Sequence, residues 1–206
     1  SHIMRFKVDN YGLRLLIGIM LWDFFSSGSL LGIASLSSKA SMLSKVYFRR
    51  EIIPLSANII ASLTLLFNMI VLFVFLLFHG LYPTKLWLLV PFYVLPIALM
   101  LIGFSFFLGA LNLFYGDVQH IWDVVKQLGF WATPIIYPIS IVPQDAQYFF
   151  RLNPFACCIE AVRLILINNS RPSLWSLAYS LTVSVVVLFV GYYVFLRKEP
   201  QFAEVI

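Results

Sequence analysis

The stretch LSANIIASLTLLFNMIVLFVFLLF, residues 55–78, decides what kind of protein this is. Its 24 residues contain no charged side chain, and a helix needs about 20 apolar residues to cross a bilayer core. Elsewhere the chain is similar, because 61% of its 206 residues are hydrophobic and only 11% are charged. Soluble domains contain roughly 45–50% apolar and about 25% charged residues. We therefore predict an all-α integral membrane protein, a polytopic helical bundle forming a single transmembrane domain over residues 1–206.

Outside this stretch, the chain contains four more candidate spans. Three are continuous apolar runs, and one is interrupted by Pro134 and Pro138, whose rings do not fit inside a regular helix. The five expected spans are residues 11–36, 55–78, 86–114, 124–142 and 174–196.

The distribution of Lys and Arg in the short connections predicts the orientation. The connection of residues 39–50 is the most basic, so we place it in the cytoplasm, and the segment 115–126 returns to that side. Two basic residues directly follow the last span, which predicts a cytoplasmic C-terminus. Five spans would then leave the basic residues 1–10 outside, so we expect a sixth, upstream span in the natural chain.

Residues 144–172 are too polar to cross a membrane and too apolar to be a free loop. Pro154 suits the first position of a helix, with Asn153 as its N-cap. Four apolar residues then recur at helical spacing opposite Glu160 and Arg163, which predicts extracytoplasmic re-entrant or interfacial helices. The Glu160–Arg163 pair either stabilises its helix or gates the outer exit. The expected outer-gate residues are Tyr148, Phe149, Phe150, Glu160 and Arg163.

The segment LSKVYFRREIIPLS, residues 43–56, gathers basic residues in an otherwise apolar chain. Its apolar and charged side chains interleave, which predicts a short amphipathic helix beneath the membrane, stopped near Pro54, within a cytoplasmic region of residues 39–53. One face would meet the membrane or the bundle, and the other a partner. The alternative is a charged loop resting on lipid head groups.

The residues give no support for catalysis or for bound metal. The three histidines are scattered, and no Ser or Cys has a visible base. Asp117, His120 and Asp123 have a metal-like spacing, but we interpret them as the solvated face of a short cytoplasmic helix. The adjacent Cys157 and Cys158 are unsuited to a mutual disulfide. The net charge of +5 sets topology and does not indicate nucleic-acid binding.

Several motifs, in order along the whole chain, resemble those of ABC exporter permeases of the polysaccharide-export type. Arg49 stands where that family often has Pro, Gly116 stands where it often has Arg, and the family's N-terminal interface helix and first span have no match. The matching motifs are LWDFFSSG (21–28), KVYFRREIIPLS (45–56), LNLFYGDVQHIWDVV (111–125), FWATPIIYP (130–138), LNPF…EAVR (152–163) and RKEPQFAEVI (197–206).

The resemblance implies a homodimer in the bacterial cytoplasmic (inner) membrane that binds two cytoplasmic ATPase subunits and exports a lipid-linked, O-antigen-like polysaccharide. The chain contains no G-x-x-x-x-G-K-[ST] phosphate loop, so ATP and Mg²⁺ would be bound by the partner, and this chain would hold no cofactor. Residues 45–51 would be the coupling helix. The expected ATPase contacts are Lys45, Val46, Tyr47, Phe48, Arg49, Arg50 and Glu51.

Aromatic side chains within the spans suggest a channel on whose flat faces sugar rings slide, although packing and lipid contact would also explain them. Asp23 lies inside an apolar span and either lines a pore, contacts a second copy or hydrogen-bonds to a neighbouring helix. The expected channel-lining residues are Trp22, Asp23, Phe24, Phe25, Phe130, Trp131 and Tyr137.

Other cargoes and other classes stay open at this stage. The same fold could carry a drug or a lipid, or a teichoic-acid or capsule polymer. A passive channel or a membrane scaffold without an ATPase is a different class of function, and an intramembrane enzyme is the least favoured.

Overall fold

The computed structural model describes residues 10–39, 49–136 and 152–202. Within these ranges every regular element is helical, and four helices are long and apolar enough to cross a membrane. The elements are α1 (Tyr11–Ser38), α3 (Ile52–Phe78), the 3-10 turn η1 (Lys85–Leu89), α4 (Val90–Tyr115), α5 (Val118–Ala132), α7 (Pro154–Leu166), α8 (Leu174–Lys198) and the 3-10 turn η3 (Glu199–Gln201). The predicted all-α membrane bundle is confirmed.

Four of the five expected spans match these helices closely. The third begins with η1 and continues as α4, which accommodates Pro96 in its interior. The expected span of residues 124–142 is placed differently: α5 begins six residues earlier, at Val118, and ends at Ala132, before Pro134. Residues 137–142 of that expected span lie outside the described residues.

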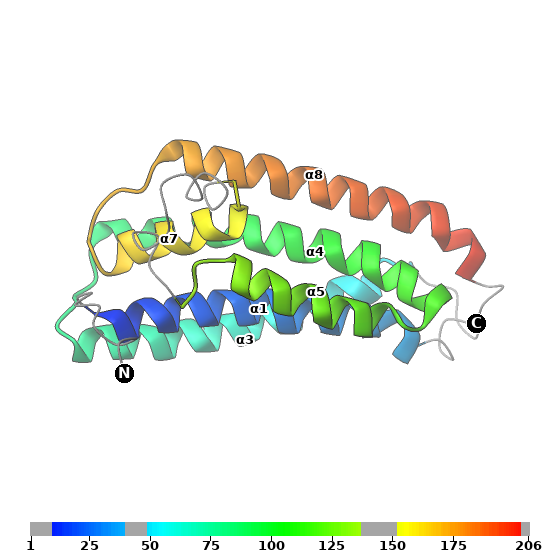
Figure 1. Cartoon of the computed structure of the whole chain (residues 1–206), viewed down its shortest axis with the longest axis horizontal. Coiled ribbons are helices and arrows are strands. Elements are labelled where there is room, and N and C mark those ends of the chain that lie inside the picture. The colour runs from blue at the N-terminus through cyan, green and yellow to red at the C-terminus, as the bar shows by residue number, and fades with distance from the viewer. Residues whose placement is uncertain (1–9, 40–48, 137–151, 203–206) are drawn as a thin grey trace.

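The helices form an elongated bundle with two distinct ends (Figure 1). At one end, which we call the basic end, the C-terminus of α1, the N-termini of α3 and α5 and the C-termini of α4 and α8 come together. At the other, the α7 end, lie the start of α1, the turn after α3, η1, α7 and the start of α8. Contacts hold each end together, such as Asn112 with Ser37 at the basic end and Thr84 with Asn169 at the α7 end.

Helix α4 is the centre of the bundle, because it packs against α8 on one side and α1 on the other. The α4–α8 contact depends on two glycines that face each other. A Cβ on Gly103 would lie 2.7 Å from the carbonyl oxygen of Val187, and a Cβ on Gly191 would overlap the Gly103 carbonyl. Small residues allow such close approach of helices in membranes, where packing rather than hydrophobicity drives association.

One expectation near the basic end is wrong. Pro54 does not stop a helix; it lies in the first turn of α3, where its missing N–H would have no helical partner. Residues 118–126, which we expected to hold a short cytoplasmic helix, form the first part of α5. Trp122 on that helix is buried, and its indole N–H donates to Ser29 Oγ at 2.8 Å.

Candidate functional site

Helix α5 lies alongside the middle of α1 and runs in the opposite direction. Trp122 reaches Ser29, and seven residues further along α5, about two helical turns, Gly129 lies against the Trp22 ring. Ser29 is nine residues from the end of α1 at Ser38, or about 14 Å at 1.5 Å per residue. Residues 123–128 of α5 are therefore level with the central third of α1, at mid-depth in the bundle.

At this depth α5 presents three different faces. Trp122 and Lys126 are its buried residues, and Lys126, only 8% exposed, forms an ion pair with Asp123 at 2.9 Å. A second face exposes polar groups at helical spacing: His120, Asp123 and Gln127. We call these three residues the polar stripe. A third face exposes Ile121, Val124, Val125 and Leu128.

The polar stripe is costly to place against lipid. Charged side chains within membrane spans almost always face the bundle interior or a water-filled cavity. The third, apolar face of α5 is suited to lipid or to another helix. Asp23 on α1 is also exposed at mid-depth, and among the described residues its carboxylate makes no hydrogen bond or ion pair to another helix. Helices α1 and α5 therefore both offer polar groups to the space outside the chain's own core.

Aromatic rings fill the contact between α1, α4, α5 and α7. Phe25 is the centre of this cluster, with its ring centroid 4.5 Å from that of Phe155 and 5.6 Å from that of Phe104. Trp22 packs edge-on against Phe130 and Phe155, at 6.0 and 5.7 Å. The cluster fixes the position of α5 mainly through ring packing, because α5 buries few other side chains.

The structure separates the described channel-lining candidates into three groups. Phe24 and Phe25 are buried, so they pack the core of this chain and do not face an open path. Trp22 and Phe130 are half-buried, whereas Asp23 and Trp131 are exposed. Tyr137 lies outside the described residues. The exposed pair stays a prediction for the channel wall.

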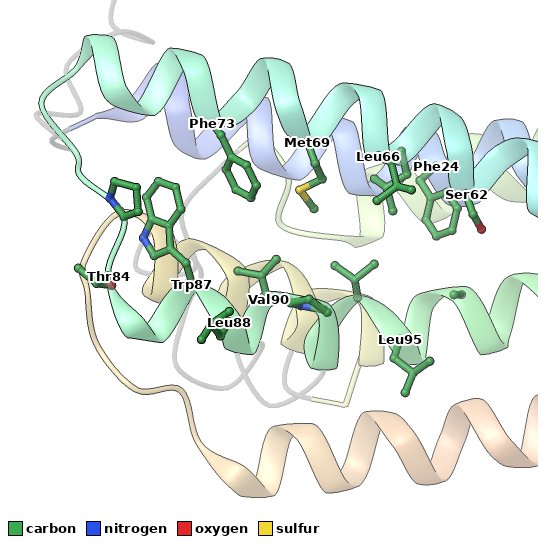
Figure 2. Close-up of a pocket in the computed structure, with 15 residues that line it drawn as sticks. Phe24, Ser62, Leu66, Met69, Phe73, Thr84, Trp87, Leu88, Val90 and Leu95 are labelled. Carbon is green, nitrogen blue, oxygen red and sulfur yellow. The ribbon is translucent and has the colours of Figure 1, made fainter.

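Phe24 instead contributes to an apolar cavity of about 620 Å³ between α3 and the η1–α4 segment. Figure 2 shows Met69 and Phe73 of α3 facing Trp87 and Val90 across this cavity. The Phe73 and Trp87 rings stack at 5.1 Å near its α7 end. Ser62 and Thr84 are the polar residues in its lining.

At the α7 end, Arg163 organises the segment that follows α5. The sequence pattern placed it on the polar face of its helix, yet it is only 4% exposed. Its guanidinium donates to the carbonyl oxygens of Arg14, Pro134 and Ile135 at 3.0, 3.0 and 2.8 Å. Burial lowers the pKa of Arg163, and the nearby Glu160 opposes that shift. The buried position is explained because the break after α5 leaves carbonyls that need donors.

Neighbouring side chains complete the cluster of polar contacts around Arg163 at the α7 end. The predicted Glu160–Arg163 pair is confirmed at 3.6 Å, and Glu160 also lies 3.8 Å from Arg14. Tyr11 donates to the carbonyl oxygen of Ile136 at 2.8 Å, so side chains satisfy three consecutive carbonyls of the break. The predicted N-cap is confirmed, because Asn153 Oδ1 accepts from the amides of Phe155 and Ala156. Of the other expected gate residues, Tyr148, Phe149 and Phe150 lie outside the described residues.

The expected coupling residues also fall into two groups, those outside the described residues and those that the structure describes. Lys45, Val46, Tyr47 and Phe48 lie outside the described residues. Arg49 is 79% exposed at the basic end and lies 3.4 Å from Glu51. Arg50 and Glu51 turn toward α8 and the turn after it.

The sequence did not predict the polar stripe as a unit. His120 and Asp123 were expected on the solvated face of a short helix, and the structure leaves both exposed, whereas Gln127 fell within the expected span of residues 124–142. A signal was nevertheless present, since the spacing of Trp122 and Gly129 is that of a helix face made for close packing. Within the described residues, no group of three or more His, Cys, Asp or Glu side chains is placed to hold a metal ion.

Four helices long and apolar enough to cross a membrane, packed into one bundle, are the architecture of a polytopic membrane protein. The family model of the ABC-2 type transporters matches residues 2–167. The chain belongs to this family, as a permease component.

Relatives with curated names are similar along nearly the whole chain. An O-antigen export system permease protein RfbA from Klebsiella pneumoniae is 27% identical over 206 residues, which are 99% of this chain and 79% of the relative. A protein of the same name from Myxococcus xanthus is 26% identical over 204 residues, which are 98% of this chain and 78% of the relative.

Proposed function

We propose that this chain is the membrane-spanning subunit of an ATP-driven exporter that moves a lipid-linked polysaccharide of the O-antigen type across the bacterial inner membrane. Two copies form the channel, and two cytoplasmic ATPase subunits bind ATP and Mg²⁺. The basic end, including the C-terminus, lies in the cytoplasm. This chain supplies the path and receives the motion, and it needs no cofactor of its own.

The observation that carries the channel role is the polar stripe, whose Asp123 and Gln127 lie at mid-depth. A helix face in contact with lipid would place His120, Asp123 and Gln127 in an apolar environment at a cost in free energy. A face along the path of a hydroxyl-rich polymer can instead form hydrogen bonds through these side chains. The exposed Trp131 lies one turn beyond the stripe and adds a flat surface for the C–H faces of sugar rings. Such contacts are individually weak, which suits a polymer that must keep moving.

The similarity to O-antigen export permeases supports the cargo class. It extends over 98–99% of this chain rather than over one motif. Membership of the ABC-2 family favours ATP-driven transport over a passive channel or a scaffold. The position of the exposed Arg49 at the basic end supports an ATPase contact there.

Cysteine substitution on α5 tests the channel role. The background carries Cys157→Ser and Cys158→Ser and so has no cysteine. In this background, Gln127→Cys places a single thiol on the polar stripe, and Leu128→Cys places a single thiol on the neighbouring apolar face. Both positions are exposed in this protomer. We expect a bulky polar thiol reagent to block polymer export in cells carrying Gln127→Cys and to spare export in cells carrying Leu128→Cys. Equal sensitivity, or none at either position, would contradict the assignment of the stripe to the path.

The cargo is tested with the purified complex of this chain and its ATPase subunit. We expect the rate of ATP hydrolysis to rise on addition of lipid-linked polysaccharide. A rate of ATP hydrolysis that does not change with polymer but rises with a small hydrophobic drug would indicate that the exporter carries drugs instead. Absence of any co-purifying ATPase under mild detergent would reject the exporter itself.

A further inference from the structure

Arg50 and Glu51, the two residues directly before α3, contact their own chain rather than open solvent. Arg50 donates from Nη1 to the carbonyl oxygen of Glu199 at 2.6 Å, and its guanidinium lies 5.8 Å from the centre of the Phe202 ring. Glu51 accepts a hydrogen bond from the Tyr192 hydroxyl at 2.8 Å. Both partners lie about 140–150 positions further along the chain, on α8 or just after it.

Phe202 packs into the core of this junction. Its side chain is fully buried, with ring centroids 5.5 Å from Phe195 of α8 and 5.9 Å from Phe114 of α4. Leu36 at the end of α1 and Ile53 at the start of α3 belong to the same buried cluster. The turn after α8 is therefore built into the basic end, where four helices meet.

We infer that Arg50, Glu51, Tyr192 and Phe202 form a clasp that joins residues 49–51, the described part of the expected coupling helix and here called the coupling segment, directly to α8, so that α8 moves with this segment when the ATPase acts. The inference rests on the proposed function, because it concerns how motion received at the basic end spreads through the permease. It assigns Arg50 and Glu51 to positioning, and it adds Tyr192 and Phe202, to which the sequence analysis gave no individual role.

The geometry favours a mechanical link over a passive surface contact. Hydrogen bonds with one ionised partner are stronger and shorter than neutral ones, and Arg50 and Glu51 provide one each, to two successive parts of the chain. Because Arg50 and Glu51 are adjacent, they contact the chain both before and after the C-terminal turn of α8, at Tyr192 and at Glu199. Arg49 on the same segment pairs with Glu51 at 3.4 Å and leaves 79% of its side chain exposed, so it can also face a partner.

A purely local role for Glu51 has to be separated from the clasp. A carboxylate before a helix stabilises its N-terminus, so Glu51→Gln alone is not decisive. Tyr192→Phe removes only the hydroxyl and leaves that carboxylate in place. Tyr193→Phe is the matched control, because Tyr193 is the adjacent tyrosine on α8 and is 55% exposed.

The experiment measures ATP hydrolysis and polymer export by the same assembled complex. For Tyr192→Phe combined with Arg50→Met, we expect ATP hydrolysis close to the parent rate but export lowered by about fivefold or more, as the loss of charge-assisted hydrogen bonds predicts. Tyr193→Phe should change neither. If export and hydrolysis fall together, in proportion to the amount of complex recovered, the four residues are only structural and the inference is overturned. Unchanged export would overturn it as well.

A cross-link separates failure of the clasp from failure of the proposed function. In the cysteine-free background, Glu51→Cys with Tyr192→Cys should be joined by a short bifunctional thiol reagent in native membranes, whereas Glu51→Cys with Tyr193→Cys should not. A parent complex that neither recruits an ATPase nor exports polymer rejects the proposed function whatever the cross-link shows. Absence of the Glu51–Tyr192 cross-link in an exporting complex rejects the clasp alone.

Discussion

At the scale of single residues, position in the fold overrides residue type. Arg163 is a charged side chain that lies among buried ones, because three backbone carbonyls converge on its guanidinium. Gly18 makes this possible: a Cβ there would lie 2.6 Å from the Arg163 guanidinium. A buried charge is tolerated only when its donors are paired, and here the partners come from α1 and from the break after α5.

Replacing Arg163 should destabilise the α7 end. Arg163→Met leaves the carbonyls of Pro134 and Ile135 buried without donors, which we expect to cost about 2–4 kcal/mol. Arg171→Met is the control, because Arg171 is exposed and the change in charge is the same. The midpoint of thermal unfolding in detergent should fall for Arg163→Met and stay constant for Arg171→Met. Equal midpoints would show that the three hydrogen bonds are unimportant.

The cysteines of α7 should differ from surface thiols in their response to pH. Burial raises the pKa of Cys158 to about 12, and burial also raises the pKa of Cys157. Only the thiolate reacts rapidly with maleimides, so a raised pKa keeps Cys158 neutral and slow at every pH below that value. In Cys157→Ser protein, labelling at pH 8 should be slow when folded and rapid after unfolding in detergent. Fast labelling of the folded protein would contradict the buried position.

At the scale of elements, the spacing of small residues decides how closely helices approach. Gly103 and Gly191 bring α4 and α8 into backbone contact. Gly32 and Gly109 allow a similar close approach of α1 and α4, since a Cβ on Gly109 would lie 3.1 Å from the Gly32 carbonyl oxygen. Buried polar pairs add to the packing, such as Ser105 Oγ, which donates to Asn58 Oδ1 at 3.0 Å. Helix α5 lacks an extensive apolar contact and is held by Trp122 and the aromatic cluster, which leaves its polar stripe exposed.

A large side chain at Gly191 should force α8 away from α4. Gly191→Leu introduces atoms where the Gly103 carbonyl now lies, and overpacking of this kind costs about 1–3 kcal/mol or more. Gly12→Leu is the matched control, since nothing lies within 4 Å of a Cβ at Gly12. Gly191→Leu should lower the yield and thermal stability of the purified protein, whereas Gly12→Leu should lower neither. Equal behaviour of the two variants would place the α4–α8 contact elsewhere.

At the scale of the whole molecule, the bundle has one basic end and one end capped by α7 (Figure 1). The positive-inside rule predicts that the basic end lies in the cytoplasm. The structure brings residue 39, the Gly116–Asp117 turn and the turn after α8 to that same end, as the charge pattern predicted. In the proposed orientation the α7 end would face the opposite side, where we expect an exported polymer to leave.

Two exposed serines test this orientation. In the cysteine-free background, Ser38→Cys lies at the basic end and Ser173→Cys at the start of α8. We expect a membrane-impermeant maleimide to label Ser173→Cys in intact spheroplasts and Ser38→Cys only after the membrane is opened. The reverse pattern would place the coupling segment outside the cell and reject the proposed function.

The sequence by itself determined the class of protein, four spans nearly to the residue, the N-cap at Asn153 and the Glu160–Arg163 pair. These features are local, because each depends on the apolarity or spacing of residues that are neighbours along one helix. The tertiary structure alone decided that Arg163 is buried, that α5 carries its polar stripe to mid-depth, and that Arg50 and Glu51 grip α8. These features join residues far apart in sequence, and whether a polar side chain faces solvent, a path or a distant partner depends on which helix the fold brings beside it.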